Sequence, residues 1–278
     1  MTKGIRLLTL VAASFIAATP ALTQEFKPQV GQAGKDVIWV PTPDEVVDRM
    51  LNMAQATAND IVYDLGSGDG KIVIAAAKKF GARATGFEFN PDMVRLSQRN
   101  AQAAGVADKA TFRQADIFQS DITPATVITM YLLPSLNLKL RPQLLNMRPG
   151  TRVVSHSFDM DEWKADEIST IDGRRAYLWI VPASVAGFWT VETSVAGGSG
   201  KYDITFDQRF QGIDGLVRLG GIQAGLRQAR LTGASISFGV IDEQGVRRDF
   251  SGVVSGNKME GSYSTDKGLT GRWSAAKK

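Results

Sequence analysis

Two different spacings of apolar residues divide this chain. Up to about residue 181, short apolar runs alternate with stretches whose apolar positions recur at helical spacing, which predicts alternating strands and helices. The predicted strands are residues 61–65, 82–89, 110–115, 125–131 and 152–155, and then a hairpin of residues 163–171 and 175–181. Such alternation predicts a parallel sheet with right-handed crossovers, whose ligands lie beyond the C-terminal ends of its strands.

From Gly187 onward, apolar and polar residues alternate at period two, and glycine-rich turns separate the runs. Residues 187–278 are therefore predicted to form a small antiparallel all-β domain, a closed barrel or a sandwich of about eight short strands. The texture of this segment is similar to that of small lipocalin-like barrels. Residues 187–278 contain no group of residues typical of a catalytic site, so we expect this domain to bind a partner or to stabilise the protein.

Residues 1–24 form a separate unit. A positively charged start precedes an apolar run, residues 7–18, and small residues follow, which is the pattern of a secretory signal peptide cleaved after Ala21 or Thr23. We therefore expect export to a periplasmic or extracellular location, and the alternative is an uncleaved segment that anchors the chain in a membrane. Residues 25–40 are predicted to be an ordered lead-in.

The amino-acid composition limits the kinds of functional site that the chain can contain. The chain has 278 residues and a net charge of +4. It has no dense run of lysine or arginine, so its charge gives no reason to expect nucleic acid binding. The absence of cysteine excludes disulfides, thiolate catalysis and cysteine-based metal sites. We predict no metal site, and the sequence leaves the oligomeric state open.

A glycine-rich turn follows the predicted strand 61–65. Gly66, Gly68 and Gly70 stand at every second position, where they allow a sharp turn and a close approach of the backbone to a ligand. The spacing matches neither the dinucleotide fingerprint nor the phosphate loop. Asp64, two residues before the first glycine, would oppose a pyrophosphate and suits a cationic amino-acid end. These features favour S-adenosylmethionine as the ligand.

Two further acids stand where the next predicted strands end. A carboxylate at Glu88 can accept hydrogen bonds from both ribose hydroxyls, and one at Asp116 can accept from the adenine amino group. Asn90, which ends one strand and starts the next helix, is included in the predicted cofactor site. Pro41 and Thr42 have two interpretations: a cap of the helix that follows, or a loop that closes over the ligand.

Several stretches taken together resemble a known family. They are residues 39–43 (WVPTP), 62–77 (VYDLGSGDGKIVIAAA), 86–91 (GFEFNP), 125–142 (ATVITMYLLPSLNLKLRP) and 149–158 (PGTRVVSHSF). This set resembles class I S-adenosylmethionine-dependent methyltransferases. Within them it resembles the mitochondrial-type protein-lysine methyltransferases that act on the adenine nucleotide translocase and the ATP synthase c-subunit, with their bacterial relatives.

The resemblance implies a Rossmann-like α/β methyltransferase domain with a seven-stranded sheet in residues 41–183. It also implies cofactor contacts from Asp64, Gly66, Gly68, Glu88 and Asp116, and it favours the loop interpretation of residues 41–42, at the methionine end of the cofactor. The implied acceptor is a protein lysine, in a protein that can be membrane-associated, and a small molecule is the alternative acceptor. The signal peptide and the all-β domain are departures from the eukaryotic members.

Methyl transfer requires an acceptor nucleophile aligned with the activated methyl group and protected from water. Tyr131 and His156, the only histidine, stand at the ends of the fourth and fifth strands. We expect both to face the cavity, and they are the candidate catalytic residues. His156 is interpreted either as a proton acceptor or as a hydrogen-bonding partner of the loop above it. Residues 132–134 (LLP) differ from the polar motif of amino-methylating DNA enzymes, which counts against nucleic acid.

Two alternatives to methyl transfer remain. One is an extracytoplasmic binding protein whose methyltransferase fold has degenerated, and the other is a nicotinamide oxidoreductase, which the glycine spacing disfavours.

Overall fold

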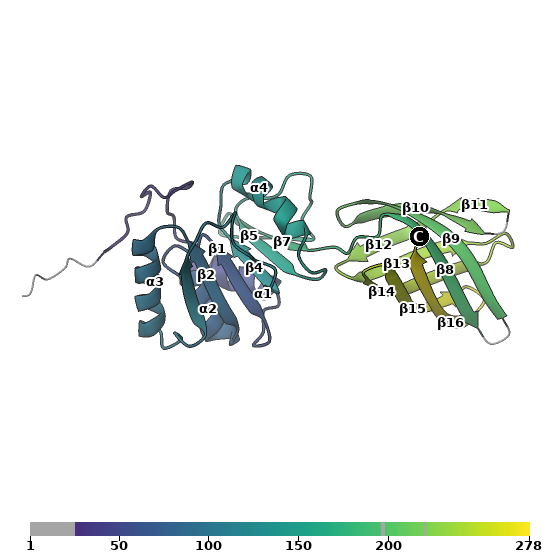
Figure 1. Cartoon of the computed structure of the whole chain (residues 1–278), viewed down its shortest axis with the longest axis horizontal. Helices are drawn as coiled ribbons and strands as arrows, with labels where there is room; N and C mark the ends of the chain where they lie inside the picture. Colours follow the sequence, from purple (N-terminus) through teal and green to yellow (C-terminus); the bar gives the residue numbers. More distant parts are fainter. Residues whose placement is uncertain (1–25, 196–197, 220) are drawn as a thin grey trace, which may run out of the picture.

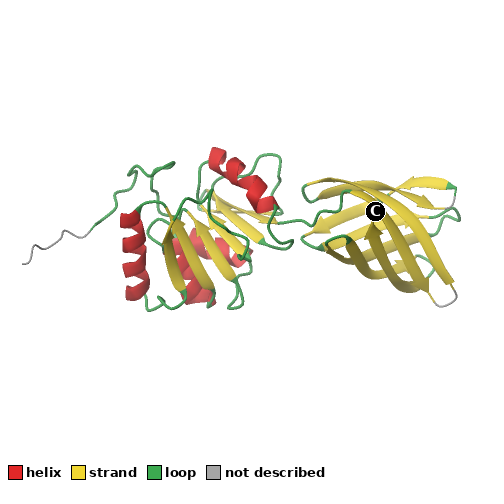
Figure 2. Ribbon diagram, in the orientation of Figure 1, coloured by secondary structure: helices red, strands yellow, loops and turns green. Residues whose placement is uncertain are grey.

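The computed structural model describes residues 26–195, 198–219 and 221–278, so the predicted signal peptide lies outside the described residues. The described chain forms two β-sheet bodies that lie side by side along the long axis of the molecule (Figure 1). Helices accompany the first sheet, and the second body consists of strands and loops (Figure 2). None of the helices in the described part is long and apolar enough to cross a membrane.

The first sheet has seven strands in the order β3-β2-β1-β4-β5-β7-β6. Its strands are β1 (Ile61–Leu65), β2 (Arg83–Glu88), β3 (Ala110–Gln114), β4 (Val127–Met130), β5 (Arg152–His156), β6 (Glu167–Ile171) and β7 (Arg174–Ile180). The first five pair in parallel, while β7 lies antiparallel between β5 and β6. The predicted parallel sheet and closing hairpin are confirmed, although β6 begins later than predicted.

Alternation along the buried strands gives the first sheet two apolar faces. Val62 packs on the side of α1 (Asp44–Met53), α2 (Lys71–Phe80) and α3 (Pro91–Ala103), whereas Tyr63 packs on the side of α4 (Pro134–Leu145). Because side chains alternate across a strand, a sheet covered on both faces needs apolar residues at successive positions. The apolar runs in the sequence therefore mark strands that are buried on both sides.

The start of helix α1 contradicts the helix-cap interpretation of residues 41–42. The helix begins at Asp44 with Pro43 as its N-cap residue, and no side chain caps it. The hydroxyl of Thr42 instead lies 3.2 Å from Nδ1 of His156. The helix-cap interpretation of Thr42 is thus wrong, because a partner distant in sequence takes up the hydroxyl.

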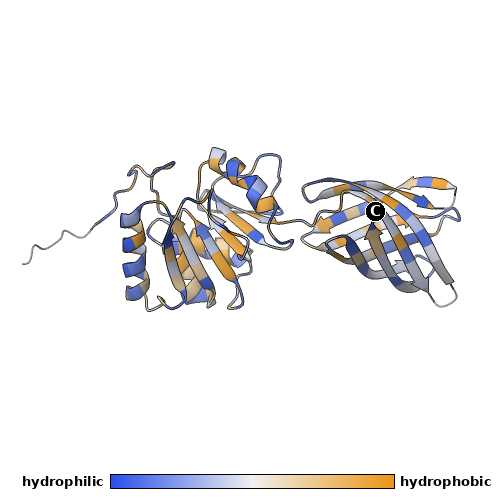
Figure 3. Ribbon diagram, in the orientation of Figure 1, coloured by the Kyte–Doolittle hydropathy of each residue, from blue (hydrophilic) through white to orange (hydrophobic). Residues whose placement is uncertain are grey.

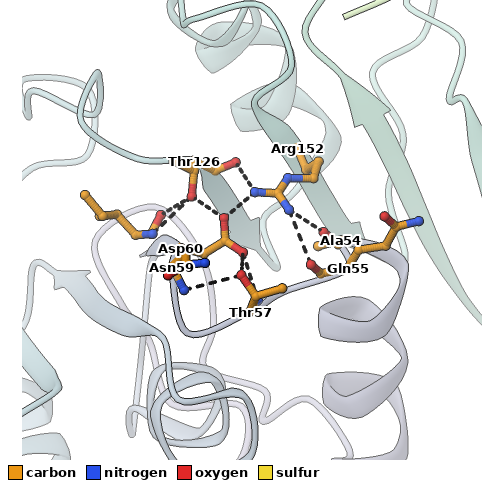
Figure 4. Close-up of polar contacts among 8 residues, drawn as sticks. Ala54, Gln55, Thr57, Asn59, Asp60, Thr126 and Arg152 are labelled. Atoms are coloured by element: carbon orange, nitrogen blue, oxygen red, sulfur yellow. Dashed lines mark hydrogen bonds and ion pairs between the residues drawn. The ribbon is translucent and has the colours of Figure 1, made fainter.

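A polar network ties together the N-terminal ends of three strands, opposite the edge where ligands are expected (Figure 4). Asp60, just before β1, accepts hydrogen bonds from the hydroxyls of Thr57 (3.0 Å) and Thr126 (2.7 Å), and it forms an ion pair with Arg152 at the start of β5. Arg152 also donates to the carbonyl of Ala54 after α1, at 2.9 Å. This network links the starts of β1, β4 and β5 to one another and to the end of α1.

The second sheet has nine strands in the order β11-β10-β9-β8-β16-β15-β14-β13-β12, and all neighbours pair antiparallel. Its strands are β8 (Gly187–Val195), β9 (Gly198–Arg209), β10 (Gly212–Leu219), β11 (Ile222–Gly225), β12 (Arg227–Thr232), β13 (Ser235–Ile241), β14 (Arg247–Ser255), β15 (Lys258–Thr265) and β16 (Thr270–Lys277). The prediction of an antiparallel all-β fold is confirmed.

The second sheet curls into a nearly closed barrel. Strands β11 and β12 follow one another across Leu226, and they pair with β10 and β13, the two ends of the curl. The N–H of Leu226 donates to the carbonyl of Gly215 in β10 at 2.9 Å, which joins the two edges. Because closure removes exposed strand edges, this arrangement protects the domain from edge-to-edge association.

Aromatic side chains fill the barrel. Phe238 and Phe250 stack with their ring centres 4.9 Å apart, and Trp273 meets both rings edge-on. Figure 3 shows hydrophilic and hydrophobic positions alternating along the barrel strands, as expected when one face of each strand points inward. The barrel therefore has a core of its own, separate from the two faces of the first sheet.

Candidate functional site

A cavity of about 320 Å³ lies at the C-terminal ends of the first sheet's parallel strands. Its walls come from the lead-in, the glycine turn after β1, the ends of β2 and β3, and the segments that follow β4 and β5. Cavities of this size hold small molecules and cofactors, and this edge is where open α/β sheets bind ligands. Among the described residues, no group of three histidines and acids is arranged to hold a metal ion.

The glycine turn has the conformation for which glycine was predicted to be needed. Gly66, Gly68 and Gly70 have φ angles of +83°, +54° and +83°, in the left-handed region that disfavours other residues. A Cβ atom on Gly68 would stand 2.8 Å from Nε1 of Trp39. The turn is therefore pressed against the lead-in, and this wall of the cavity has no room for a side chain.

Glu88 is fixed by backbone donors. Its carboxylate accepts hydrogen bonds from the N–H of Gly68 at 3.0 Å and from the N–H of Asn90 at 2.9 Å. Asn90 also lines the cavity, but its side-chain oxygen caps α3 by accepting from the N–H of Asp92 at 2.8 Å. Asn90 thus positions Glu88 through its backbone while its side chain serves the helix.

Asp116 lies at the same cavity, paired with a lysine that sequence reasoning did not single out. Its carboxylate is 2.7 Å from Nζ of Lys35, and that ammonium also lies 4.6 Å from the ring centre of Phe89. The hydrogen bond from Lys35 is the main reason that the pKa of Asp116 lies below its usual value. Lys35 stands in a small irregular hairpin of the lead-in, closed by the bridge between Ala33 and Ile38, and no local motif marks it.

Asp64 is the most deeply buried acid of the cavity, with 2% of its surface exposed. The hydroxyl of Thr129 donates to its carboxylate at 2.7 Å. Burial raises the pKa of Asp64 to about 7, and the nearby carboxylates Asp69 and Glu88 act in the same direction. A cationic group placed against Asp64 would oppose this shift, so the carboxyl is suited to the ammonium of an amino acid.

Tyr131 lines the cavity, and His156 lies behind it. The centres of these two rings are 4.0 Å apart, and Phe158, which also lines the cavity, stacks on Tyr131 with ring centres 6.2 Å apart. His156 is 2% exposed, and its Nε2 has no hydrogen-bond partner among the described residues. Burial, and secondarily the charge of Arg174, lower the pKa of His156 to about 4, so the ring is neutral at pH 7.

The prediction that His156 faces the cavity does not match this placement. Tyr131 and Thr42 separate the imidazole from the cavity, so His156 can act there only through them. Pro41 and Thr42 do line the cavity, as the loop interpretation requires. We use the term aromatic wall for Tyr131 and Phe158, the second of which sequence reasoning missed.

The cavity fits S-adenosylmethionine. Asp64, Glu88 and Asp116 all line it, which agrees with the predicted roles of these acids, and the buried hydroxyl of Ser67, also in the lining, has no partner among the described residues. When bound, this cofactor supplies a methyl group already activated by its sulfonium. The residues of the chain then have to hold the cofactor, exclude water and orient an acceptor.

Comparisons with known proteins agree with this geometry. The family model of the ANTKMT methyltransferase domain matches residues 64–167. A protein-lysine N-methyltransferase from Saccharolobus islandicus (strain REY15A) is 42% identical over 151 residues, which cover 52% of this chain and 94% of that protein. The chain belongs to the ANTKMT methyltransferase family.

Two more relatives extend the comparison of this methyltransferase. A lysine N-methyltransferase of the ATP synthase c-subunit, from Mus musculus, is 29% identical, over 82% of this chain and 81% of that protein. The crystal structure of an RNA methyltransferase from Salinibacter ruber in complex with S-adenosyl-L-homocysteine is 53% identical, covers 52% of this chain and 96% of that one, and has a TM-score of 0.52. The protein is thus an S-adenosylmethionine-dependent methyltransferase, and nothing supports a degenerate binding protein.

Proposed function

We propose that this methyltransferase transfers the methyl group to the side-chain amine of a lysine in a protein. The observation that carries the proposal is the 42% identity to a protein named as a protein-lysine N-methyltransferase, nearly all of which this chain matches. The printed names of the relatives differ, however, since the Salinibacter ruber protein is called an RNA methyltransferase. The side chains around the acceptor therefore bear on whether it is a protein lysine or an RNA.

We assign the acceptor to the part of the cavity lined by the segments that follow β4 and β5, and this acceptor side suits a long aliphatic chain that ends in an amine. The aromatic wall and three leucines, Leu132, Leu133 and Leu136, line it. Apolar surface can pack against the methylene groups of a lysine, and aromatic faces attract its ammonium. Burial also lowers the pKa of a lysine amine, which favours the neutral form that attacks the methyl group. Aromatic side chains also stack on nucleobases, so RNA is the second acceptor class that the test has to include.

Transfer of labelled methyl groups tests this proposal. We would incubate the protein with labelled S-adenosylmethionine and, in parallel, with total protein, a membrane fraction and total RNA from the same cells. The expected result is label in methyl-lysine after protein hydrolysis. A membrane-associated acceptor remains part of the proposal, and label confined to soluble protein would contradict that part.

The control is Glu88→Ala, whose affinity for S-adenosylmethionine should fall by about ten- to a hundredfold, because hydrogen bonds to a charged group are lost. Incorporation should fall with it. Label that enters RNA and not protein would instead assign the acceptor class named for the Salinibacter ruber relative.

A further inference from the structure

One cavity-lining residue, Phe158, stands on a segment that lies outside the helices and strands. Residues 157–166 connect β5 to β6 as a loop, and this loop carries Phe158 of the aromatic wall. Ser157, at its start, has a φ angle of +65°, a conformation that costs free energy unless neighbouring contacts hold it. What holds this loop therefore decides where the aromatic wall stands.

Helix α4 holds the loop from one side. Asn137, fully buried, donates its amide to the carbonyls of Phe158 and Asp159, both at 3.2 Å. Arg141, one turn later on α4, donates to the carbonyl of Met160 at 2.9 Å. These bonds belong to the methyltransferase domain itself.

The barrel holds the same loop from the other side. At the turn between β9 and β10, the ring of Phe210 stacks on Trp163 with centres 6.2 Å apart and planes 16° from parallel. Gln211 donates to the carbonyl of Lys164 at 2.6 Å. Trp163 is fully buried, so the stack is part of a packed core.

Two weaker contacts accompany this stack. Arg209 pairs with Glu162 at 2.6 Å, but both side chains are largely exposed, and exposed ion pairs contribute little. The guanidinium of Arg141 lies 5.6 Å from the ring centre of Phe210. One arginine of α4 therefore contacts both the loop and the barrel turn that braces it.

We propose that the β9–β10 turn is a positioning element of the active site. Phe210 and Gln211 hold residues 157–166 and, through them, Phe158 in the aromatic wall. The acids that line the cofactor end of the cavity stand at the C-terminal ends of β1 and β2 and just after β3, whereas the contacts of this turn described above are with residues 162–164 and with Arg141. The barrel thus affects the binding and orientation of the acceptor and leaves the affinity for the cofactor unchanged.

The test compares full-length variants. Phe210→Ala removes the stack, Phe210→Tyr retains the ring, and Phe188→Ala is the matched control, because Phe188 is a barrel phenylalanine that is 65% exposed. Gln211→Ala removes the hydrogen bond to the carbonyl of Lys164 and is the second test if Phe210→Ala does not fold. The readouts are hydrogen exchange of residues 157–166, the Kd for S-adenosylmethionine, and kcat and KM for methylation of poly-L-lysine.

Phe210→Ala should speed exchange at the amides of Trp163 and Asp166 and raise the KM for poly-L-lysine, each by about three- to tenfold, with the Kd for S-adenosylmethionine within about twofold of the original. Phe210→Tyr should restore both values, and Phe188→Ala should change neither. Unchanged exchange in a folded Phe210→Ala variant would overturn the proposal, as would faster exchange with unchanged KM and kcat.

The kcat and KM measurements with poly-L-lysine rest on the proposed lysine specificity, whereas the hydrogen-exchange measurement does not. If the unaltered protein leaves poly-L-lysine unmethylated, the lysine proposal fails in that assay, and the hydrogen-exchange measurement alone decides whether the turn braces the loop.

Discussion

At the scale of single residues, the three cofactor-side acids of the cavity are in three different electrostatic states. Asp64 is buried and has a raised pKa, Glu88 is held by two backbone N–H groups, and Asp116 is paired with Lys35. Burial raises the pKa of Asp64 and Lys35 lowers that of Asp116, so Asp64 is the carboxyl whose charge depends on the ligand. This difference has a measurable consequence.

Binding of S-adenosylmethionine should depend on the protonation of Asp64. Its pKa of about 7 in the ligand-free protein means that the carboxyl becomes protonated as the pH falls below 7, whereas the bound ammonium favours the carboxylate. Affinity should therefore fall by up to about tenfold per pH unit below pH 7 and level off above pH 8. Calorimetry between pH 5.5 and 8.5 measures this, and Asp64→Asn should lose the dependence. A flat profile in the unaltered protein would contradict it.

The glycine turn yields a second prediction at this scale. Gly68→Ala should weaken S-adenosylmethionine binding by about tenfold or more, because the methyl group meets Trp39 and the left-handed backbone costs roughly 1–2 kcal/mol in addition. The matched control is Gly105→Ala, since Gly105 has a φ angle of +71° and nothing within 4 Å of the added carbon. Equal effects of both substitutions on the Kd would show that strain alone matters, and not the contact with the lead-in.

At the scale of elements, the two ends of the parallel strands have separate tasks. The C-terminal ends carry the cavity, and the N-terminal ends are joined by the network around Asp60. Burial acts to raise the pKa of Asp60, but hydrogen bonds from Thr126, Arg152 and Thr57 outweigh it, so the pKa lies below its usual value. The stability that this carboxylate contributes is present above about pH 4 and is lost as the pH falls through its lowered pKa.

Asp60→Asn should destabilise the protein by about 3 kcal/mol at pH 7, because it leaves the partly buried Arg152 without its charge partner. Denaturant unfolding measures the change. The matched control is Asp48→Asn, which breaks the exposed pair with Lys79 and should cost less than about 1 kcal/mol. The Kd for S-adenosylmethionine should stay the same in both folded variants, and a large change in Asp60→Asn would mean that the two strand ends are coupled.

At the scale of the whole molecule, the barrel and the methyltransferase domain each have their own core and share a small contact. The contact includes the β9–β10 turn against residues 162–166 and against Arg141 of α4. It also includes Gly233, where an added Cβ would stand 3.0 Å from the Cα of Gly150. Domains joined in this way commonly retain their separate stability.

Residues 25–186 alone should therefore bind S-adenosylmethionine with nearly the affinity of the full chain. All proposed cofactor residues lie within this segment. Calorimetry on the truncated protein measures the affinity, and far-ultraviolet circular dichroism verifies that it is folded. Methylation of the acceptor should fall, since the loop with Phe158 loses its brace. A folded truncation that no longer binds the cofactor would show that the two domains are not independent.

The sequence alone determined the parts of this protein that depend on local patterns. The strand, glycine turn and helix from Ile61 to Phe80, and the acids that follow the strands, are set by periodicity and by φ angles that glycine tolerates. Parallel strands end at one edge of a sheet, so acids at successive strand ends had to meet around one cavity.

Only the tertiary structure decided which partners these side chains have. Thr42 lies 114 positions from His156, and Lys35 lies 81 positions from Asp116, so no local pattern could pair them. Thr42 does not cap a helix but contacts His156, which agrees with the interpretation of His156 as a hydrogen-bonding partner of the loop above it. Packing between distant elements sets this contact and places His156 behind Tyr131. The brace from Phe210 to Trp163 is decided in the same way, since it depends on how two separate cores meet.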